Sequence, residues 1–277
     1  MMLINGEDKG EIAVTDRGFQ YGDGLFETIK VIKSRPIFLE HHLQRLNTGC
    51  LKLNIPQPNA KQLIDEIKAV CKDSEQAVLK LIITRGSGGR GYRQPDPIQP
   101  IRVISLHPFP EYPSSNYQEG ITARFCETRL GLNPTLAGIK HLNRLEQIMA
   151  RAEWTDPAIQ EGIMLDINNH VIEGTMTNLF YVKDGIIYTA TLNLSGVAGI
   201  MRGIIMEIIV ERNLKLIEHG YHKEELLSAD EAFVCNSIIG LWPIRRLEQY
   251  VFSEHRLTKQ IQQWLMDYKT QGLANVE

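Results

Sequence analysis

The segment from Val171 to Arg202 places chemically useful side chains at the ends of expected regular elements. Glu173 closes one expected strand, and Asn178 opens the next. Gly199 begins a predicted helix, whose first N–H groups have no partner inside the helix and therefore attract anions such as a phosphate. A carboxylate close to a helix-bound phosphate suits a cofactor that has both a phosphate and a basic ring nitrogen.

Other residue patterns that could indicate a functional site lack the neighbouring residues that the function requires. The eight histidines form no HExxH or comparable pair beside a carboxylate, so no metal site is predicted. The run RGSGGRGY resembles a phosphate-cradling loop, but it lacks the Gly-Lys-Ser/Thr ending and no helix follows it. No GxSxG nucleophile elbow occurs either. We therefore predict a flexible loop at RGSGGRGY.

Composition and charge restrict the class of protein. The chain has 277 residues, 43% apolar and 23% charged, which excludes general disorder and a disulfide-dense small protein. Lys and Arg number 30 against 33 Asp and Glu, a net charge of −3 without an evident basic face. This balance argues against binding to nucleic acid or to an anionic membrane. We expect a small-molecule substrate.

Cysteine spacing and the first residues predict a cytoplasmic protein. Cys50, Cys71, Cys126 and Cys235 form no CxxC pair and are expected to be buried thiols in a reducing compartment. The opening MMLINGEDKGEIAV lacks the apolar core of a signal peptide. No stretch approaches the roughly 20 apolar residues of a membrane span.

Periodicity predicts a small α+β domain over residues 1–107. Its first strands should form a hairpin at the Asn5-Gly6 turn, which pairs residues 3–4 with residues 12–14. Leu43, Leu46, Cys50 and Leu53 recur at helical spacing. The other expected elements are β-rich runs on either side of residues 34–36, a helix over 60–71, and strands over 77–85 and 101–107.

Residues 108–120 concentrate Pro, Ser and Gly and are predicted to be an interdomain linker. Residues 121–277 should then form a larger, cofactor-binding domain. The run HLNRLEQIMARAEW predicts a helix with one apolar face, formed by Leu142, Leu145, Ile148, Met149 and Ala152. Further strands are expected at GIMLDI, NLFYVK, GIIYTA and EAFVCNS, and helices at GIMRGIIMEIIVERN and near residues 257–269.

A composite motif connects these elements to a known group of enzymes. It is Glu173-x-Thr175-x-x-Asn178-Leu179-Phe180, then Thr189, then Val197-x-Gly199-Ile200-x-Arg202. The motif resembles the signature of the fold-type IV pyridoxal-phosphate enzymes, which include branched-chain aminotransferases, D-amino-acid aminotransferases and 4-amino-4-deoxychorismate lyases. The resemblance covers nearly the whole chain and is far more specific than a single glycine motif. It implies a small N-terminal domain and a larger C-terminal one.

The resemblance implies that pyridoxal 5′-phosphate is the cofactor and that Lys140, in AGIKHLNRLEQ, forms the Schiff base with it. Glu173 matches the carboxylate that keeps the pyridine nitrogen protonated, which strengthens the ring as an electron sink. Arg45 matches the phosphate-binding arginine of the family. A guanidinium suits this role because it can donate two parallel hydrogen bonds to phosphate oxygens. Without the resemblance, Lys140 and Arg45 would be interpreted as solvated cations. The other implied cofactor contacts are the Val197 side chain, the N–H groups of Ile200 and Met201, and the Ser237 hydroxyl.

Three stretches resemble the lyases of this group: RGSGGRGY, KHLNRLEQ and YGDGLFET. Thr28 matches a threonine implicated in the proton handling of those lyases. D-amino-acid aminotransferases have an Arg followed two residues later by a His, where this chain has Arg90 and Tyr92, and a Tyr in place of Phe26. We therefore expect Lys140 and Thr28 to be catalytic. Arg90 should hold a substrate carboxylate, with Tyr92 and Phe26 beside it.

The resemblance thus implies a lyase that converts 4-amino-4-deoxychorismate to 4-aminobenzoate and pyruvate, and that acts as a homodimer. One alternative is a D-amino-acid or branched-chain aminotransferase, which would use the same lysine. A second is a binding protein that kept the fold and lost the cofactor. That second alternative is disfavoured because Lys140, Glu173 and Arg45 are all present.

Overall fold

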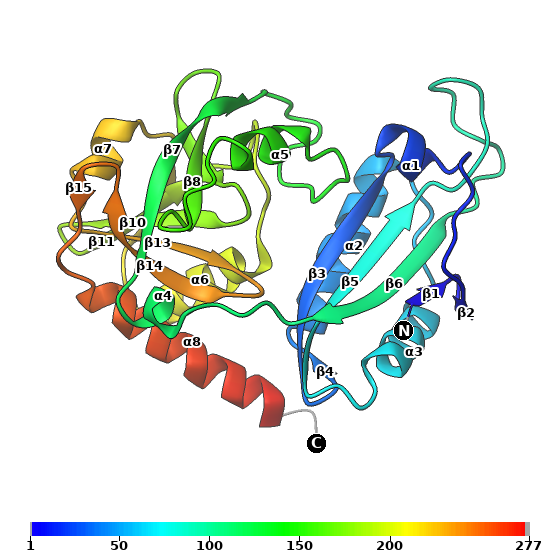
Figure 1. The fold of residues 1–277 in the computed structure, drawn as a ribbon, viewed down its shortest axis with the longest axis horizontal. Coiled ribbons are helices and arrows are strands. Elements are labelled where there is room, and N and C mark those ends of the chain that lie inside the picture. The colour runs from blue at the N-terminus through cyan, green and yellow to red at the C-terminus, as the bar shows by residue number, and fades with distance from the viewer. Residues whose placement is uncertain (1, 275–277) are drawn as a thin grey trace. The chain divides into compact units, whose positions relative to one another are not determined.

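The computed structural model of the chain describes residues 2–274, with only the backbone of residues 269–274. The chain forms two compact units, each with its own sheet and helices (Figure 1). Unit 1 comprises Met1–Pro110 and Ile139–Asn143, and unit 2 comprises Glu111–Gly138 and Arg144–Glu277. This combination of sheets and helices confirms the predicted α+β class.

Two features differ from the linear division predicted from the sequence. Residues Ile139–Asn143, expected in the larger domain, belong to unit 1, because their backbone bonds to a strand of that unit. Residues 111–120, expected in a linker, belong to unit 2. Aromatic packing holds them there, since the Tyr112 ring meets the Trp242 ring edge-on with centroids 4.9 Å apart.

Unit 1 contains a six-stranded sheet in the order β2-β1-β6-β5-β3-β4, and its neighbouring strands are antiparallel. In strand β3, Leu25, Ile29 and Val31 alternate with half-buried residues, as a sheet with one covered face requires. Helices α2 and α3 pack on that covered face through Leu46 and Ile67. The strands are β1 (Met2–Ile4), β2 (Glu7–Asp8), β3 (Gly24–Ile32), β4 (Arg35–Pro36), β5 (Gln76–Thr84) and β6 (Ile101–Pro108).

Two helices of unit 1 begin where a side chain satisfies one of their first N–H groups. The Asp16 carboxylate accepts from the Phe19 N–H at the start of α1, and the Asn59 side chain accepts from the Gln62 N–H at the start of α3. The predicted hairpin at Asn5-Gly6 forms, but its second strand is β2, and residues 12–14 lie outside any strand. The helices are α1 (Arg17–Tyr21), α2 (Leu39–Leu53) and α3 (Ala60–Cys71).

Unit 2 contains a nine-stranded sheet that closes on itself. The path β10-β13-β14-β7-β8-β9 returns to β10, since Asn178 of β10 pairs with Glu173 of β9. Strands β11 and β12 extend the sheet, and β15 pairs with β14. The strands are β7 (Ile121–Leu130), β8 (Glu161–Asp166), β9 (Val171–Gly174), β10 (Asn178–Lys183), β11 (Ile186–Ala190), β12 (Leu216–His219), β13 (Glu231–Asn236), β14 (Gly240–Leu247) and β15 (Tyr250–Val251).

Helices α6 and α8 of unit 2 pack against each other and against β13. Helix α5 begins at Leu145, so Leu142 lies outside the predicted apolar face, and Leu145, Ile148 and Met149 are exposed, at 71%, 62% and 61% of their accessible surface. The helices are α4 (Ser114–Gln118), α5 (Leu145–Arg151), α6 (Ile200–Glu211), α7 (Lys223–Leu227) and α8 (Arg256–Ala274). Among residues 2–274 no helix combines the length and apolarity that crossing a membrane requires.

Candidate active site

Lys140 lies beside strand β3 of unit 1. The Phe26 N–H donates to the Lys140 carbonyl at 3.1 Å, and the Leu142 N–H donates to the Gly24 carbonyl at 3.0 Å. These bonds make residues 139–143 a short additional partner of β3. The Lys140 Nζ lies 4.3 Å from the centre of the Phe26 ring, a cation–π contact that holds the ammonium over the ring.

Phe26 and Thr28 share the face of β3 opposite α2 and α3. Thr28 pairs in register with Lys80 of β5, and the Lys80 Nζ lies 6.0 Å from the Phe26 ring centre. This face therefore presents a hydroxyl and two amines around one aromatic ring. The structure brings together Phe26 and Lys140, as the predicted roles of both residues require, and it places Thr28 two residues further along the same strand.

Arg45 of α2 forms an ion pair inside unit 1. Its Nε donates to Glu27 Oε1 at 2.8 Å, and its Nη2 donates to Glu27 Oε2 at 2.5 Å. The His42 Nδ1 lies 2.6 Å from Glu27 Oε2. Glu27 is 1% exposed, so this bidentate pair fixes the plane of the Arg45 guanidinium.

The charges of this group follow from burial and pairing. Burial by itself raises the pKa of Glu27, but the Arg45 guanidinium and the His42 hydrogen bond outweigh it and lower that pKa to about 2. Burial lowers the pKa of His42 despite the opposing carboxylate, which favours the neutral imidazole. The group is therefore an ionised carboxylate between a permanent cation and a neutral ring.

Glu173 is a buried carboxylate of unit 2. Its Oε2 accepts from the Val197 N–H at 2.8 Å and lies 3.4 Å from the Asn178 Nδ2. The same Asn178 amide donates to the Val197 carbonyl at 2.9 Å. Glu173 is therefore held by the strand pair that closes the sheet and by the segment that leads into α6.

Helix α6 begins directly after this segment. Gly199 occupies its N-cap position and offers no side chain to cap the helix, so the first N–H groups, including those of Ile200 and Met201, remain available to an anion. A Cβ at Gly199 would lie 2.0 Å from the Asn178 Oδ1, which explains the glycine. Unit 2 thus joins a buried carboxylate to an uncapped helix start through Val197, an arrangement that fits a cofactor with a ring nitrogen and a phosphate.

Ser237 follows strand β13 in a turn held by its neighbour Asn236. The Asn236 Oδ1 accepts from the N–H groups of Ile238 and Ile239, both at 2.9 Å, and its Nδ2 donates to the Met176 carbonyl at 3.1 Å. Asn236 therefore ties the turn that carries Ser237 to the turn after Glu173.

Arg90 and Tyr92 lie in the loop of residues 85–100 of unit 1, away from regular elements. Tyr92 is 88% exposed, and its ring meets the Tyr21 ring edge-on with centroids 5.8 Å apart. No described contact joins this loop to Lys140 or Phe26. The substrate-binding role of Arg90 and Tyr92 therefore stays a prediction.

Sequence reasoning missed two residues that support this site, Glu27 and Arg144, and the contact that a third, Asn178, makes. Glu27 could have been identified from the sequence, because it is a charged residue on the same face of β3 as the buried Leu25 and Ile29. Asn178 was part of the motif, but only the structure shows that it bonds to Val197. Arg144 was not identified from the sequence. Burial lowers the pKa of its guanidinium, and the nearby carboxylates of Glu173 and Glu146 act in the opposite direction.

The chain belongs to the amino-transferase class IV family, whose pattern matches residues 24–247. Two relatives named for one reaction are similar to it. It is 38% identical to the aminodeoxychorismate lyase of Vibrio harveyi over 244 residues, 88% of this chain and 90% of that protein. The 4-amino-4-deoxychorismate lyase structure from Pseudomonas aeruginosa shares 43% identity and a TM-score of 0.93 over 96% of this chain and 98% of that one.

An aminotransferase is more distant. The branched-chain amino acid aminotransferase structure from Escherichia coli shares 27% identity and a TM-score of 0.82, over 95% of this chain and 92% of that one. The structural likeness is thus greater to the lyase than to this aminotransferase.

Proposed function

We propose that the chain is an aminodeoxychorismate lyase that uses pyridoxal 5′-phosphate to release 4-aminobenzoate and pyruvate. The observation that carries the proposal is the arrangement in unit 2, where the buried Glu173 carboxylate and the uncapped start of α6 are joined through Val197. Similarity to the two lyases supplies the substrate.

The residues of this chain have separate tasks in holding the cofactor. In unit 2, Glu173 would support a positive charge on the pyridine nitrogen, and Val197 would pack against the ring. The N–H groups of Ile200 and Met201 and the Ser237 hydroxyl would bind the phosphate. The family resemblance assigns Arg45 of unit 1 to the phosphate as well. When bound, pyridoxal phosphate supplies a protonated ring that accepts the electron pair released at the substrate carbon.

Lys140 moves the proton. Its amine would hold the cofactor through the aldehyde group until the substrate amine takes its place. The free amine then removes the hydrogen from the amine-bearing ring carbon. The carbon–oxygen bond to the enolpyruvyl group breaks, the ring becomes aromatic, and Lys140 or Thr28 returns a proton to give pyruvate. Substrate and products balance without an oxidant or a second substrate.

Phe26 favours the lyase over the D-amino-acid aminotransferase. D-amino-acid aminotransferases resemble this chain but have a Tyr at the Phe26 position, whereas here the position offers only an apolar ring under the Lys140 ammonium. That ring cannot donate a hydrogen bond to an amino-acid carboxylate. Arg90 and Tyr92 would instead hold a carboxylate of the aminodeoxychorismate ring system.

Helix α5 supports the proposed homodimer. Its exposed Leu145, Ile148 and Met149 stand at positions i, i+3 and i+4 and form one apolar stripe on unit 2. Contiguous apolar surface of this kind marks an interaction site. We propose that a second copy of the chain covers it.

One experiment tests the reaction and the attachment of the cofactor. Purified protein is given aminodeoxychorismate and, separately, D-alanine or a branched-chain amino acid with 2-oxoglutarate. We expect 4-aminobenzoate and pyruvate in equal amounts from the first substrate and much slower transfer of an amino group from the others. Faster transamination would identify the protein as an aminotransferase instead of a lyase. No turnover of any of these substrates would favour a binding protein without the activity. Borohydride reduction and peptide mapping should place the cofactor on Lys140.

A further inference from the structure

The loop that carries Arg90 and Tyr92 is costly to order. Gly86, Gly88, Gly89 and Gly91 all have positive φ, from +56° to +110°. Glycine loses more conformational freedom on folding than any other residue, so a single conformation of this loop needs strong contacts from outside it. Those contacts come from the segment that precedes β3.

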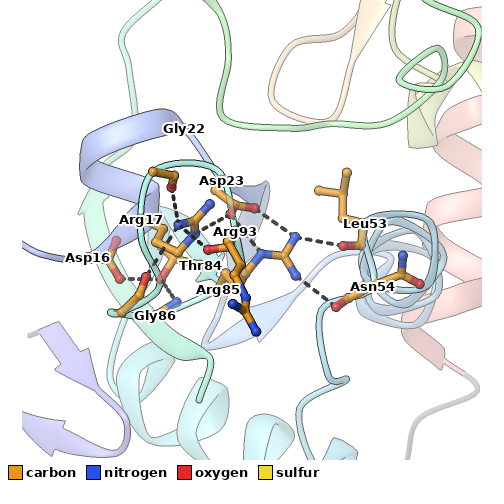
Figure 2. Close-up of polar contacts among 12 residues, drawn as sticks. Asp16, Arg17, Gly22, Asp23, Leu53, Asn54, Thr84, Arg85, Gly86 and Arg93 are labelled. Carbon is orange, nitrogen blue, oxygen red and sulfur yellow. Dashed lines mark hydrogen bonds and ion pairs between the residues drawn. The ribbon is translucent and has the colours of Figure 1, made fainter. Parts of the chain in front are cut away.

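Arg17 of α1 supplies most of them. Its Nη1 lies 3.0 Å from the Gly91 carbonyl, 3.4 Å from the Arg93 carbonyl and 3.5 Å from the Gly88 carbonyl, while its Nε donates to Asp23 Oδ2 at 2.9 Å. Figure 2 shows the Arg17 guanidinium beside Asp23 and Arg93. Arg17 is 4% exposed, so its charge is shielded from water and its hydrogen bonds to carbonyls are strengthened.

Asp23 holds a second buried arginine in the same cluster. Arg85 donates to Asp23 through Nε at 2.8 Å and Nη2 at 3.0 Å, and to the carbonyls of Leu53 and Asn54 at the end of α2 at 2.8 and 2.9 Å. One carboxylate therefore faces two guanidiniums (Figure 2). The remaining positive charge is balanced by carbonyl dipoles, those of the loop for Arg17 and those of α2 for Arg85.

Further contacts join the same two segments. The Arg17 N–H donates to the Gly86 carbonyl at 2.9 Å, and the Thr84 hydroxyl donates to Asp16 Oδ2 at 2.6 Å. The Tyr21 ring contacts both the Arg17 guanidinium, 5.1 Å from its centre, and the Tyr92 ring. Arg17 is thus connected to Tyr92 through Tyr21, and its hydrogen bonds hold carbonyls on both sides of Arg90.

We propose that Arg17, oriented by Asp23, is a positioning residue for substrate binding: it fixes the Gly88–Arg93 carbonyls so that Arg90 meets a substrate carboxylate in a ready-made conformation. The proposal rests on the proposed lyase function. Arg17 acts through Arg90, so removing it should weaken substrate binding and leave cofactor binding unchanged. Preorganising a loop in this way reduces the entropy that binding would otherwise cost.

The main test compares Arg17→Gln and Arg17→Lys with a matched control, Arg102→Gln. Arg102 is a half-buried arginine of unit 1 in a bidentate pair with Glu66, at 2.9 and 2.6 Å, and none of its described side-chain hydrogen bonds reaches the loop. We expect Arg17→Gln to raise KM for aminodeoxychorismate on the order of tenfold, with kcat changed much less. Arg17→Lys should recover only part of the loss, because it lacks the guanidinium fork. Arg102→Gln should leave KM unchanged.

A double variant separates positioning from general stability. If Arg17 acts through Arg90, adding Arg17→Gln to Arg90→Ala should raise KM no further. Independent, multiplying effects would overturn the proposal, as would an unchanged KM in Arg17→Gln. An increased dissociation constant for pyridoxal phosphate in Arg17→Gln alone would also overturn it.

Limited proteolysis reports on the loop without any substrate. Trypsin can cut after Arg90 and Arg93, and cleavage there should be several-fold faster in Arg17→Gln than in the parent or in Arg102→Gln. Equal cleavage rates would show that Arg17 does not order the loop. This readout remains valid if the parent forms no 4-aminobenzoate, so the lyase function and the role of Arg17 can fail separately.

Discussion

Individual buried charges determine how this chain holds its candidate cofactor residues. The Glu27 carboxylate sits between an arginine and a histidine with almost no access to water. Breaking such a pair leaves a charge buried without compensation, which costs far more than losing an exposed pair. Arg45 therefore depends on Glu27 for its orientation, although Glu27 has no predicted contact with the cofactor.

Glu27→Gln should weaken the binding of pyridoxal phosphate. The amide cannot accept charge-assisted hydrogen bonds from both Arg45 and His42, so Arg45 loses its fixed orientation. We expect the dissociation constant for the cofactor, titrated onto apo-protein, to rise on the order of tenfold. Glu40→Gln is the control, since Glu40 is an exposed acid in the first turn of the same helix. Equal affinities in the two variants would contradict the role of Glu27.

The pKa of Glu27 also predicts how stability depends on pH. It is about 2 in the folded protein against an ordinary value of 4.5, so the ionised carboxylate stabilises the fold. By linkage this contribution, on the order of 3 kcal/mol, is complete above about pH 5 and is lost as pH falls through 4.5 toward 2. Urea unfolding at pH 7 and pH 4 should show a smaller acid-induced loss in Glu27→Gln than in the parent or in Glu40→Gln. An equal loss in all three proteins would assign the acid sensitivity elsewhere.

At the scale of elements, the start of α6 is shaped by its contact with β10. The Asn178 side chain reaches the position where a Cβ of residue 199 would stand and holds the strand between Gly196 and Gly199 in place. The helix start, Asn178 and Glu173 are therefore set as one group. The composition of α6 gave no sign of this, because its isoleucines predict a buried helix and nothing about the residue before it.

Gly199→Ala should disturb the cofactor site, and Gly203→Ala should not. The new Cβ at position 199 would force Asn178 away, which we expect to lower stability by about 1–3 kcal/mol and to weaken cofactor binding. Gly203 lies inside the same helix, and a Cβ there meets no atom within 4 Å. That variant should be more stable by about 0.5–1 kcal/mol with unchanged cofactor affinity. Thermal unfolding and cofactor titration distinguish the two, and a benign Gly199→Ala would refute the argument.

Sequence patterns predicted most individual elements but not their distant partners. Strand β10 follows from a short continuous apolar run, and helices α2 and α3 follow from helical spacing, all of which are local properties. The pairing of residues 139–143 with β3 joins segments far apart in the chain, and no local pattern records it. Roles for Lys140 and Glu173 could be predicted from the family resemblance. The Arg17–Asp23–Arg85 cluster needs coordinates, because nothing in the sequence distinguishes these three charged residues from solvent-exposed ones.

At the scale of the whole molecule, α5 shows what an apolar helical period cannot predict. Leu145, Ile148 and Met149 share a helical face, as predicted, but that face is exposed in the single chain. Periodicity reports that a face is apolar and cannot report whether the same chain or a second copy covers it.

Ile148→Glu should therefore weaken self-association. We expect the parent to elute with about twice the 31.5 kDa mass of one chain in light scattering after gel filtration, and Ile148→Glu to shift toward the single-chain mass. Val210→Glu is the control, because Val210 is an exposed apolar residue of α6, 63% accessible, outside the α5 stripe. A parent of single-chain mass, or dissociation by Val210→Glu and not by Ile148→Glu, would reject α5 as the contact.

The return of Ile139–Asn143 to unit 1 also limits how the gene can be recombined with its relatives. A crossover at the boundary between Pro110 and Glu111 would transmit Lys140 with the coding sequence of unit 2, while its bonding partner Phe26 would come from the other parent. In the chimaera, Lys140 would pair with a strand β3 that comes from the other parent. Its amine would keep its position only if both parents pair these two segments in the same register. Strand β3 and residues 139–143 should therefore come from the same parent, although they lie on opposite sides of this boundary in the gene.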